Sequence, residues 1–367
     1  MNLLTIIIVV CVVILFAFTR VGFANPGISS VVGDIKDGEL VTINGANFGF
    51  KEGYTEFLGG KTGHIETTAP GKDVDFGSWR IADGNGTDSA AFIVTEGARS
   101  GSHAWRIESD YNGSVRYDFG SDIPENTDIF ISWWVKFDVP EEPIGQWKMF
   151  RLSHHNDIQD SGTEMVMFNW FAGSGDQLIV RPDRCAEGNK AISYYGGAYP
   201  NTPGEWVRID QYVRTSTQGQ KNGYSETTLL SDIITTSQWN NSGDTEPQYP
   251  SIYTYNSDMR YRWFIWQNYR GNGLDQLTVM MDDIYIQVGS VARVELGNKP
   301  IFEEANVREI QRVKSWDQFR IEIELNQGAF KAGDTAYLFV VDEFGHHGEG
   351  FEVTIGGSED VDDGCAG

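Results

Sequence analysis

Cysteine, histidine and basic residues are scarce in this chain of 367 residues. It has 3 Cys and 6 His, without the Cys/His spacing that binds zinc. Its 28 Lys and Arg are outnumbered by 52 Asp and Glu, which gives a formal net charge of −24. A surface this acidic repels phosphates and excludes nucleic acid as a partner. It also repels anionic polysaccharides unless a local basic patch or bound cations intervene.

Long amphipathic helices are also missing from the sequence pattern. Aromatic residues make up 13 % of the chain, which contains 42 Gly. Alternating or β-branched segments recur between turns rich in Gly, Asn and Asp. This pattern predicts an all-β protein, and the length favours two or three domains. We expect strands at residues 40–43, 129–137, 164–171, 206–213, 261–269, 277–288, 319–325 and 336–341.

Residues 1–24 have the pattern of a secretory signal peptide. An apolar run over residues 3–18 is followed by a small-x-small cleavage signal ending at Ala24. No basic residue precedes the run and Arg20 follows it, so an uncleaved membrane anchor is the alternative. Under both hypotheses we expect the rest of the protein to be secreted or held at the cell surface. Under the first, no membrane span remains in the mature chain.

Two cysteines remain after removal of such a signal peptide. In an oxidising compartment Cys185 and Cys365 can form one disulfide, and two unpaired thiols are the alternative. The disulfide would tie the acidic tail, residues 358–367, to the central region.

The two ends of the chain resemble one immunoglobulin-like domain that has been split. Residues 28–49, ISSVVGDIKDGELVTINGANFG, resemble the opening strands of the IPT/TIG family. Segments that resemble the family's later strands occur only after residue 290, as ARVELG at 292–297 and then at 316–325, 336–341 and 350–355. We therefore expect residues 25–55 and 290–357 to form one Ig-like β-sandwich around an insertion. Two separate small sandwiches are the alternative.

The central region, residues 56–289, carries four strand motifs in a familiar order. They are ARSGSHAWRI (98–107), ISWWVKFD (131–138), GEWVRIDQYV (204–213) and DDIYI (282–286). Together they resemble concanavalin A-like jelly rolls of the polysaccharide lyase type. The resemblance implies an antiparallel jelly-roll sandwich that handles polysaccharides. It does not identify an activity, because functional sites are grafted onto folds.

Aromatic residues on the strands are candidates for glycan binding. An exposed ring can stack on a sugar while a neighbouring polar group hydrogen-bonds its hydroxyls. Alternation along the strands leaves several outward positions, and packing inside the sandwich is the alternative for each aromatic. The candidates are Trp134, Lys136, Tyr212, Trp266 and Tyr269.

The lyase resemblance suggests a second set of residues. Eliminative cleavage of a uronic acid requires groups that neutralise the carboxylate, remove the neighbouring proton and protonate the leaving oxygen. Alternation places Arg151 and His154 on opposite faces of one strand, so they cannot both serve one groove. The "R.E.R" and "QIH" signatures of known alginate lyases and the hydrolase carboxylate string are absent from the central region. The candidates are Arg151, His154, Arg208, Tyr212 and Gln267.

The closing motif suggests a metal site. Jelly rolls of this type often hold a structural Ca²⁺ near the closing strand, and the resemblance implies Asp282 and Asp283 as ligands. We therefore expect a secreted carbohydrate-binding jelly-roll protein with a polysaccharide as partner, with Ca²⁺ as the only candidate cofactor. The alternatives are a polysaccharide lyase acting on a uronic-acid glycan and a structural or adhesive surface protein.

Overall fold

A computed structural model shows a protein built almost entirely of antiparallel β-sheets, which confirms the predicted all-β class. The only helical element among the described residues is one 3₁₀ turn, η1 (Phe302–Glu304), and no helix there is long and apolar enough to cross a membrane. The predicted signal peptide, residues 1–24, lies outside the described residues. The structure describes residues 25–57, 78–81, 90–109, 112–138, 146–154, 164–171, 177–181, 194–198, 204–215, 217, 224–230, 237–240, 261–270 and 277–359.

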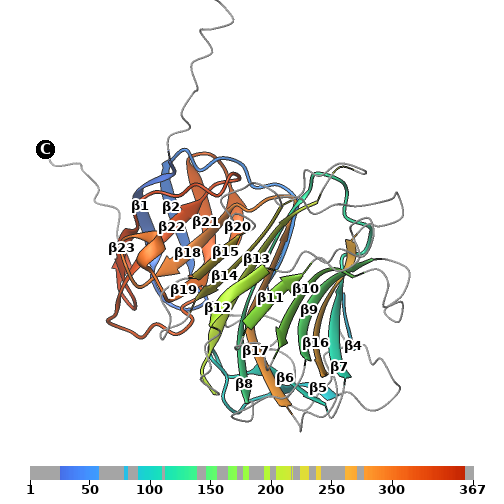
Figure 1. The fold of residues 1–367 in the computed structure, drawn as a ribbon. Coiled ribbons are helices and arrows are strands. Elements are labelled where there is room, and N and C mark those ends of the chain that lie inside the picture. Colours follow the sequence, from blue (N-terminus) through green and yellow to red (C-terminus); the bar gives the residue numbers. More distant parts are fainter. Residues whose placement is uncertain are drawn as a thin grey trace, which may run out of the picture.

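The smaller of two sandwiches is built from both ends of the chain (Figure 1). β2 pairs directly with β21, with Val41 opposite Ile323 and Ile43 opposite Ile321. One sheet has the order β20 (Arg312–Trp316), β21 (Arg320–Glu324), β2 (Leu40–Ala46), β1 (Gly27–Asp34), β24 (Ser358–Glu359). The other has the order β19 (Arg308–Ile310), β18 (Arg293–Gly297), β22 (Thr335–Val341), β23 (Phe351–Thr354).

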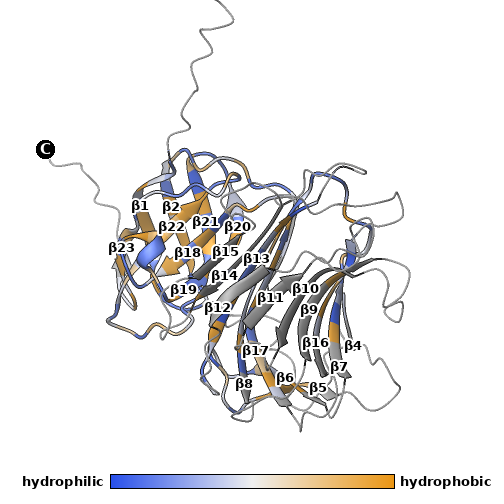
Figure 2. Cartoon of the chain, in the orientation of Figure 1, coloured by the Kyte–Doolittle hydropathy of each residue, from blue (hydrophilic) through white to orange (hydrophobic). Residues whose placement is uncertain are grey.

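Every second side chain of these strands points into the core of this sandwich. Val41 and Ile43 are buried, whereas Leu40 is exposed at the strand's start. They pack with Ile321, Ile323 and other apolar residues of both sheets in one cluster. Figure 2 shows apolar residues along the strands of this sandwich and polar residues in the segments between them.

The larger sandwich lies between these two halves in the sequence and forms a jelly roll of two antiparallel sheets (Figure 1). The eight-stranded sheet has the order β15 (Ser237–Asn240), β14 (Tyr224–Leu230), β13 (Val207–Arg214), β8 (Asp128–Asp138), β17 (Leu277–Val288), β6 (Ala104–Ser109), β5 (Ala90–Val94), and β3 (Tyr54–Phe57) pairs with β17 as well. The seven-stranded sheet has the order β12 (Tyr194–Ala198), β11 (Gln177–Arg181), β10 (Glu164–Phe171), β9 (Gln146–His154), β16 (Tyr261–Arg270), β7 (Asn112–Asp118), β4 (Trp79–Ile81).

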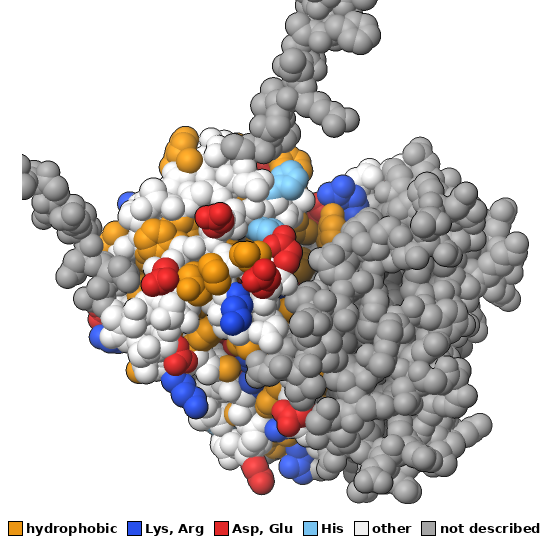
Figure 3. Space-filling model, turned by 60° about the vertical axis from the view of Figure 1, so that its left-hand side comes forward, with side chains coloured by type: hydrophobic (Ala, Val, Ile, Leu, Met, Phe, Trp, Pro, Cys, Tyr) orange, Lys and Arg blue, Asp and Glu red, His pale blue; other side chains and the backbone are white. Residues whose placement is uncertain are grey.

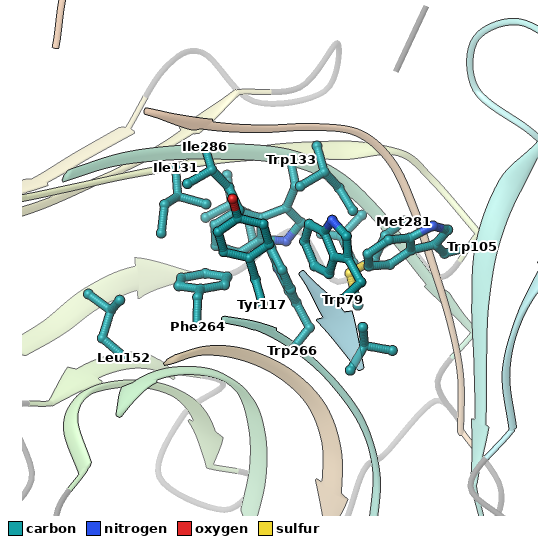
Figure 4. Packing of buried hydrophobic residues seen from close by; sticks show 14 of the residues in the cluster. Trp79, Trp105, Tyr117, Ile131, Trp133, Leu152, Phe264, Trp266, Met281 and Ile286 are labelled. Atoms are coloured by element: carbon teal, nitrogen blue, oxygen red, sulfur yellow. The ribbon is translucent and has the colours of Figure 1, made fainter. Parts of the chain in front are cut away.

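Four tryptophans fill the space between these two sheets (Figure 4). Trp79 stacks on Trp266 with ring centroids 5.1 Å apart. Trp105 and Trp133 meet Trp266 edge-on at 6.1 and 5.9 Å. Burial of such large rings supplies much of the core's hydrophobic stabilisation. The core also fixes the orientation of each strand, because residues next to a core residue must point to the outer face of their sheet.

The chain crosses between the sandwiches at two adjacent points. Tyr54 pairs with Val288 and Thr55 with Gln287, so entry and exit of the larger sandwich are neighbouring strands. Gly53 has a positive φ of 80°, and a Cβ there would lie 1.7 Å from the Val288 carbonyl oxygen. This crossing therefore requires a glycine.

Candidate functional site

The outer face of the eight-stranded sheet is covered by the smaller sandwich. Phe130 of β8 and Tyr285 of β17 form a buried cluster with Val291 and Ile310, against which Tyr212 packs. The ring centroids of Phe130 and Tyr285 lie 6.2 Å apart. The middle of this face therefore joins the two sandwiches and is not available as a glycan platform.

Charged residues are buried in the same interface. Arg208 keeps 1 % of its surface exposed, and its guanidinium donates to both carboxylate oxygens of Asp210 at 2.7 and 3.0 Å. It also donates to Glu295 of β18 at 2.9 Å, and Glu295 receives further ion pairs from Arg293 at 2.6 Å and Arg308 at 3.1 Å. Burial alone would raise the pKa of Glu295, but the three arginines hold it well below its usual range. The cluster therefore stays ionised and links the two sandwiches.

Two of the predicted catalytic residues belong to this interface. Arg208 and Tyr212 lie on β13, where Arg208 is saturated by carboxylates and the Tyr212 hydroxyl donates to Asp128 at 2.8 Å. The other three candidates, Arg151, His154 and Gln267, lie on strands of the opposite sheet. The core therefore separates the five candidates into two groups that cannot serve one groove.

Two of the predicted glycan-binding residues, Trp134 and Lys136, lie on the outer face of the eight-stranded sheet. Trp134 is 4 % exposed, and the Arg99 guanidinium lies 3.3 Å from the centroid of its ring. The Lys136 ammonium donates to the Gly97 carbonyl at 3.1 Å and lies 4.9 Å from the Trp206 ring centroid. Alternation explains this placement, because Val135, which lies between them, points into the core.

The carboxylates of Asp282 and Asp283 are occupied by hydrogen-bond donors. Asp282 accepts from the backbone amides of Arg99 (3.0 Å), Ser100 (3.1 Å) and Asp283 (2.8 Å). Asp283 accepts from the Ser100 hydroxyl at 2.9 Å and the Arg99 guanidinium at 3.1 Å. Burial, and then the neighbouring Asp283, raise the pKa of Asp282 well above its usual value. This pair does not fit Ca²⁺, because Arg99 already supplies the cation.

Arg99 makes this pair a second link between the sandwiches. Its guanidinium forms two hydrogen bonds with Glu309 of β19, one of them at 2.9 Å. Among the residues that the structure describes, no group of three or more His, Cys, Asp or Glu could hold a metal ion. Cys185 and Cys365, the predicted disulfide partners, lie outside the described residues.

The seven-stranded sheet presents its outer face away from the smaller sandwich. Val115 and Tyr117 of β7 belong to the core, as do Leu152 of β9 and Phe264 and Trp266 of β16 (Figure 4). Residues between these positions therefore lie on the outer face. Trp266, a predicted glycan-binding residue, is 1 % exposed in the core, so that prediction is wrong.

Strand register aligns four arginine positions across this sheet. Arg80 of β4 pairs with Arg116 of β7, which pairs with Ile265 of β16. Ile265 pairs in turn with Arg151 of β9, a predicted catalytic residue. The row continues through Met167 of β10 to Arg181 of β11. We call these six positions, Arg80, Arg116, Ile265, Arg151, Met167 and Arg181, the arginine row.

Described side chains near the middle of the row combine an aromatic ring with a cation. The Arg116 guanidinium lies 4.3 Å from the Trp263 ring centroid, and Trp263 is half-buried. Trp263 pairs with Asp118, whose carboxylate accepts from Arg262 at 3.1 Å. The carboxylate of Asp118 therefore lies beside the row, and the backbone position of Glu164 on β10 continues the same line through its pairing with Ser153.

The remaining candidates divide between the two faces of the sheet. Gln267 and Tyr269 alternate with Trp266 along a stretch of β16 that pairs without interruption with β7, which puts both positions on the outer face. Tyr269 pairs with Lys148 across a bulge. His154 instead pairs with Tyr261, a core residue, and occupies the face opposite to Arg151. For Arg151, His154, Gln267 and Tyr269 the structure describes strand positions and not side chains.

Trp263 and Arg116 were missed among the predicted site residues. Alternation over 261–269 places Trp263 on the same face as Gln267 and Tyr269, opposite to Trp266. The sequence does not indicate which of the two faces of this strand packs against the core.

Comparisons with known proteins yield only distant similarity. No protein-family model and no curated protein matches the chain. The marine PL-14 alginate lyase from Aplysia kurodai matches 53 % of this chain and 86 % of its own, with 14 % identity and a TM-score of 0.40. Winged bean acidic lectin complexed with methyl-α-D-galactose matches 64 % and 97 %, with 9 % identity and a TM-score of 0.40. The alginate lyase Aly36B matches 57 % and 96 %, with 12 % identity and a TM-score of 0.34.

Proposed function

We propose that this is a secreted carbohydrate-binding protein whose seven-stranded sheet binds an anionic, uronic-acid polysaccharide on its outer face. The observation that supports this most is the arginine row, four arginine positions in register across six strands of a chain with net charge −24. A protein this acidic repels an anionic glycan unless it carries a local basic patch. The arginine row would be such a patch.

The geometry of the row suits a polymer with repeated carboxylates. Neighbouring strands lie about 5 Å apart, so Arg80 and Arg116 are separated by about one such spacing and the other arginines by about two. Guanidinium groups pair with carboxylates through two parallel hydrogen bonds, which a lysine cannot reproduce. A chain lying across the strands would therefore meet a cation at regular intervals.

Trp263 supplies an apolar contact beside this row. Its ring is half-buried and held by the guanidinium of Arg116, so little conformational freedom is lost when a sugar stacks on it. We include Gln267 and Tyr269 as hydrogen-bonding positions on the same face.

Binding to a polyuronate is the direct test. Arg116→Gln and Trp263→Ala should each weaken the affinity for alginate or glucuronan at least about tenfold, which corresponds to about 1.4 kcal/mol. Binding should also weaken as salt is added, because the contacts are ionic. The matched control is Arg320→Gln, an exposed arginine on the smaller sandwich, which should bind as the wild type does. Equal binding to neutral dextran, or unchanged binding by both variants, would refute the proposal.

A lyase is the second candidate. The outer face brings together positions Arg151, Lys148, Gln267 and Tyr269, which include residue types that can neutralise a uronate and move protons. Release of unsaturated products, followed by ultraviolet absorbance on incubation with the polyuronate, would establish cleavage. Retention without such a product would assign the protein to binding alone. Failure to retain any polysaccharide would favour the structural or adhesive alternative.

We further propose that the smaller sandwich is an IPT/TIG domain acting as a spacer. Its opening motif at residues 28–49 and its assembly from the two ends of the chain support this assignment. Secretion rests on the apolar segment at residues 3–18 and would be tested by sequencing the N-terminus of the exported protein.

A further inference from the structure

A cleft of about 710 Å³ opens between the two sandwiches, on the side of the larger one opposite to the arginine row. Its volume lies within the range of about 300–1,000 Å³ that is usual for small-molecule sites. Tyr212 and Asp210 of β13 line one wall, and Arg293, Arg308, Phe344 and His347 line the other. We call it the interdomain cleft.

The buried charges at the floor of this cleft do not balance. Arg208, Arg293 and Arg308 surround only two carboxylates, those of Asp210 and Glu295. The five groups are each at least nine-tenths buried and together carry one net positive charge. An uncompensated buried charge is costly, so an anion entering the cleft would be stabilised. At the rim, Arg214 pairs with Asp128 at 2.7 Å, and the His347 imidazole lies 3.1 Å from the Glu303 carboxylate.

A fourth basic group, half-buried Lys51, lies within reach of the charge of Arg293. Lys51, in the segment between the sandwiches, donates to the Tyr285 hydroxyl at 3.0 Å. Burial, and then the charge of Arg293, lower its pKa to about 7. On the outer surface of the smaller sandwich, by contrast, acidic and basic side chains are interspersed (Figure 3).

Two of the arginines keep one donor nitrogen available. Arg293 uses Nε for Glu295 at 2.6 Å and Nη1 for the Val291 carbonyl at 3.0 Å. Arg308 uses Nε for Glu295 at 3.1 Å and Nη1 for the Phe302 carbonyl at 2.8 Å. Within the part of the chain that the structure describes, the Nη2 nitrogen of each makes no hydrogen bond.

Aromatic rings hold both guanidinium groups in place. Arg293 lies 4.1 Å from the Phe130 ring centroid and Arg308 lies 4.0 Å from that of Phe302. Their positions are therefore set before a ligand arrives, which reduces the entropy lost on binding. Phe344, more than half exposed at the opening, offers an apolar contact.

We propose that the interdomain cleft binds a small organic acid, up to about the size of one or two sugar acids, whose carboxylate is held by Nη2 of Arg293 and Nη2 of Arg308. The two nitrogens come from a β-strand pair of the smaller sandwich, while Tyr212 and Asp210 of the larger one close the opposite wall. A bound acid would therefore join the sandwiches and favour their docked arrangement. This site is separate from the arginine row, and its existence does not depend on polysaccharide binding there.

Calorimetric titration of the full chain with sodium glucuronate tests the proposal, with glucose at equal ionic strength as the uncharged control. We expect saturable binding of glucuronate and a rise in Tm, with no response to glucose. Arg293→Lys and Arg308→Lys keep the positive charge beside Glu295 but remove the planar guanidinium, and each should weaken binding at least tenfold. Lys314→Gln, at an exposed ion pair of the smaller sandwich, is the matched control and should bind normally.

A further variant keeps the test informative if the arginine variants do not fold. Phe344→Ala changes an exposed side chain at the opening and should lower glucuronate affinity several-fold without unfolding the protein. Absence of saturable binding, or normal binding by folded arginine variants, would overturn the proposal. So would loss of glucuronate binding in Arg116→Gln, since that result would place the acid on the seven-stranded sheet.

Discussion

The larger sandwich has two outer faces that carry arginine and tryptophan in similar alternating patterns, but the two faces have opposite uses. On the eight-stranded sheet, Arg208 and Trp134 are buried against the smaller sandwich. On the seven-stranded sheet, Arg116 and Trp263 remain partly exposed, one ring beside one cation. An arginine on the outer face of a sheet forms a structural ion pair where another domain covers that face, and is available to a ligand where the face is uncovered. The second domain, and not the strand pattern, makes that difference.

Glu295→Gln should have the largest effect, because it would leave three buried arginines with a single carboxylate. We expect it to lower the free energy of unfolding by about 5 kcal/mol, measured by urea denaturation. Glu322→Gln, on the exposed side of β21, is the control and should cost less than about 1 kcal/mol. A small loss in Glu295→Gln would mean that the covered face does not depend on its ion pairs.

Trp266→Ala and Trp263→Ala distinguish the two sides of β16. Removal of Trp266 leaves a cavity among three other tryptophans and should cost about 4 kcal/mol of stability. Removal of Trp263 should cost about 1 kcal/mol and reduce polyuronate binding instead. Equal destabilisation by both variants would show that the outer face of this sheet is covered in the same way as the other face.

Arg99→Ala tests the second link between the sandwiches. It would leave Asp283 and Glu309 without their cation, and we expect a loss of about 3 kcal/mol in a urea titration. Since the Arg99 guanidinium is the cation that these carboxylates bind, a chelator should not change the Tm of the wild-type protein. A fall in Tm on chelation, restored by Ca²⁺, would contradict this account.

Lys51→Met should have the smallest effect, one that depends on pH. The pKa of Lys51 is about 7 in the folded protein against 10.5 for a free lysine, so the unfolded state binds more protons between these values. Stability should therefore rise with pH across this window. We expect Lys51→Met to remove about 1 kcal/mol of that rise, whereas Lys314→Met should not change it. Parallel pH profiles of unfolding for the wild type and Lys51→Met would refute this assignment.

The strands and their alternation could be predicted from sequence, but the identity of the covered face could not. Alternation along the predicted strand 129–137 puts Ile131 and Trp133 on one face, and both are in the core. Trp266 was misassigned because both faces of residues 261–269 carry aromatic residues, and local periodicity does not tell core from surface. Arg208 and Asp282 were misassigned for a different reason. Their partners, Glu295 and Arg99, are distant in sequence, and ion pairs between such residues leave no local pattern.

The adjacency of Tyr54 and Val288 also has a consequence for how the chain reaches its native state. β1 and β2 are synthesised early, yet β2 needs β21, which follows the entire larger sandwich. Closing so long a loop in an unfolded chain carries an entropic cost. Once the larger sandwich has folded, its two end strands, β3 and β17, are hydrogen-bonded neighbours, so the two segments of the smaller sandwich leave it at adjacent points. Folding of the larger sandwich would thus bring the two segments of the smaller sandwich together and lower the entropic cost of its assembly.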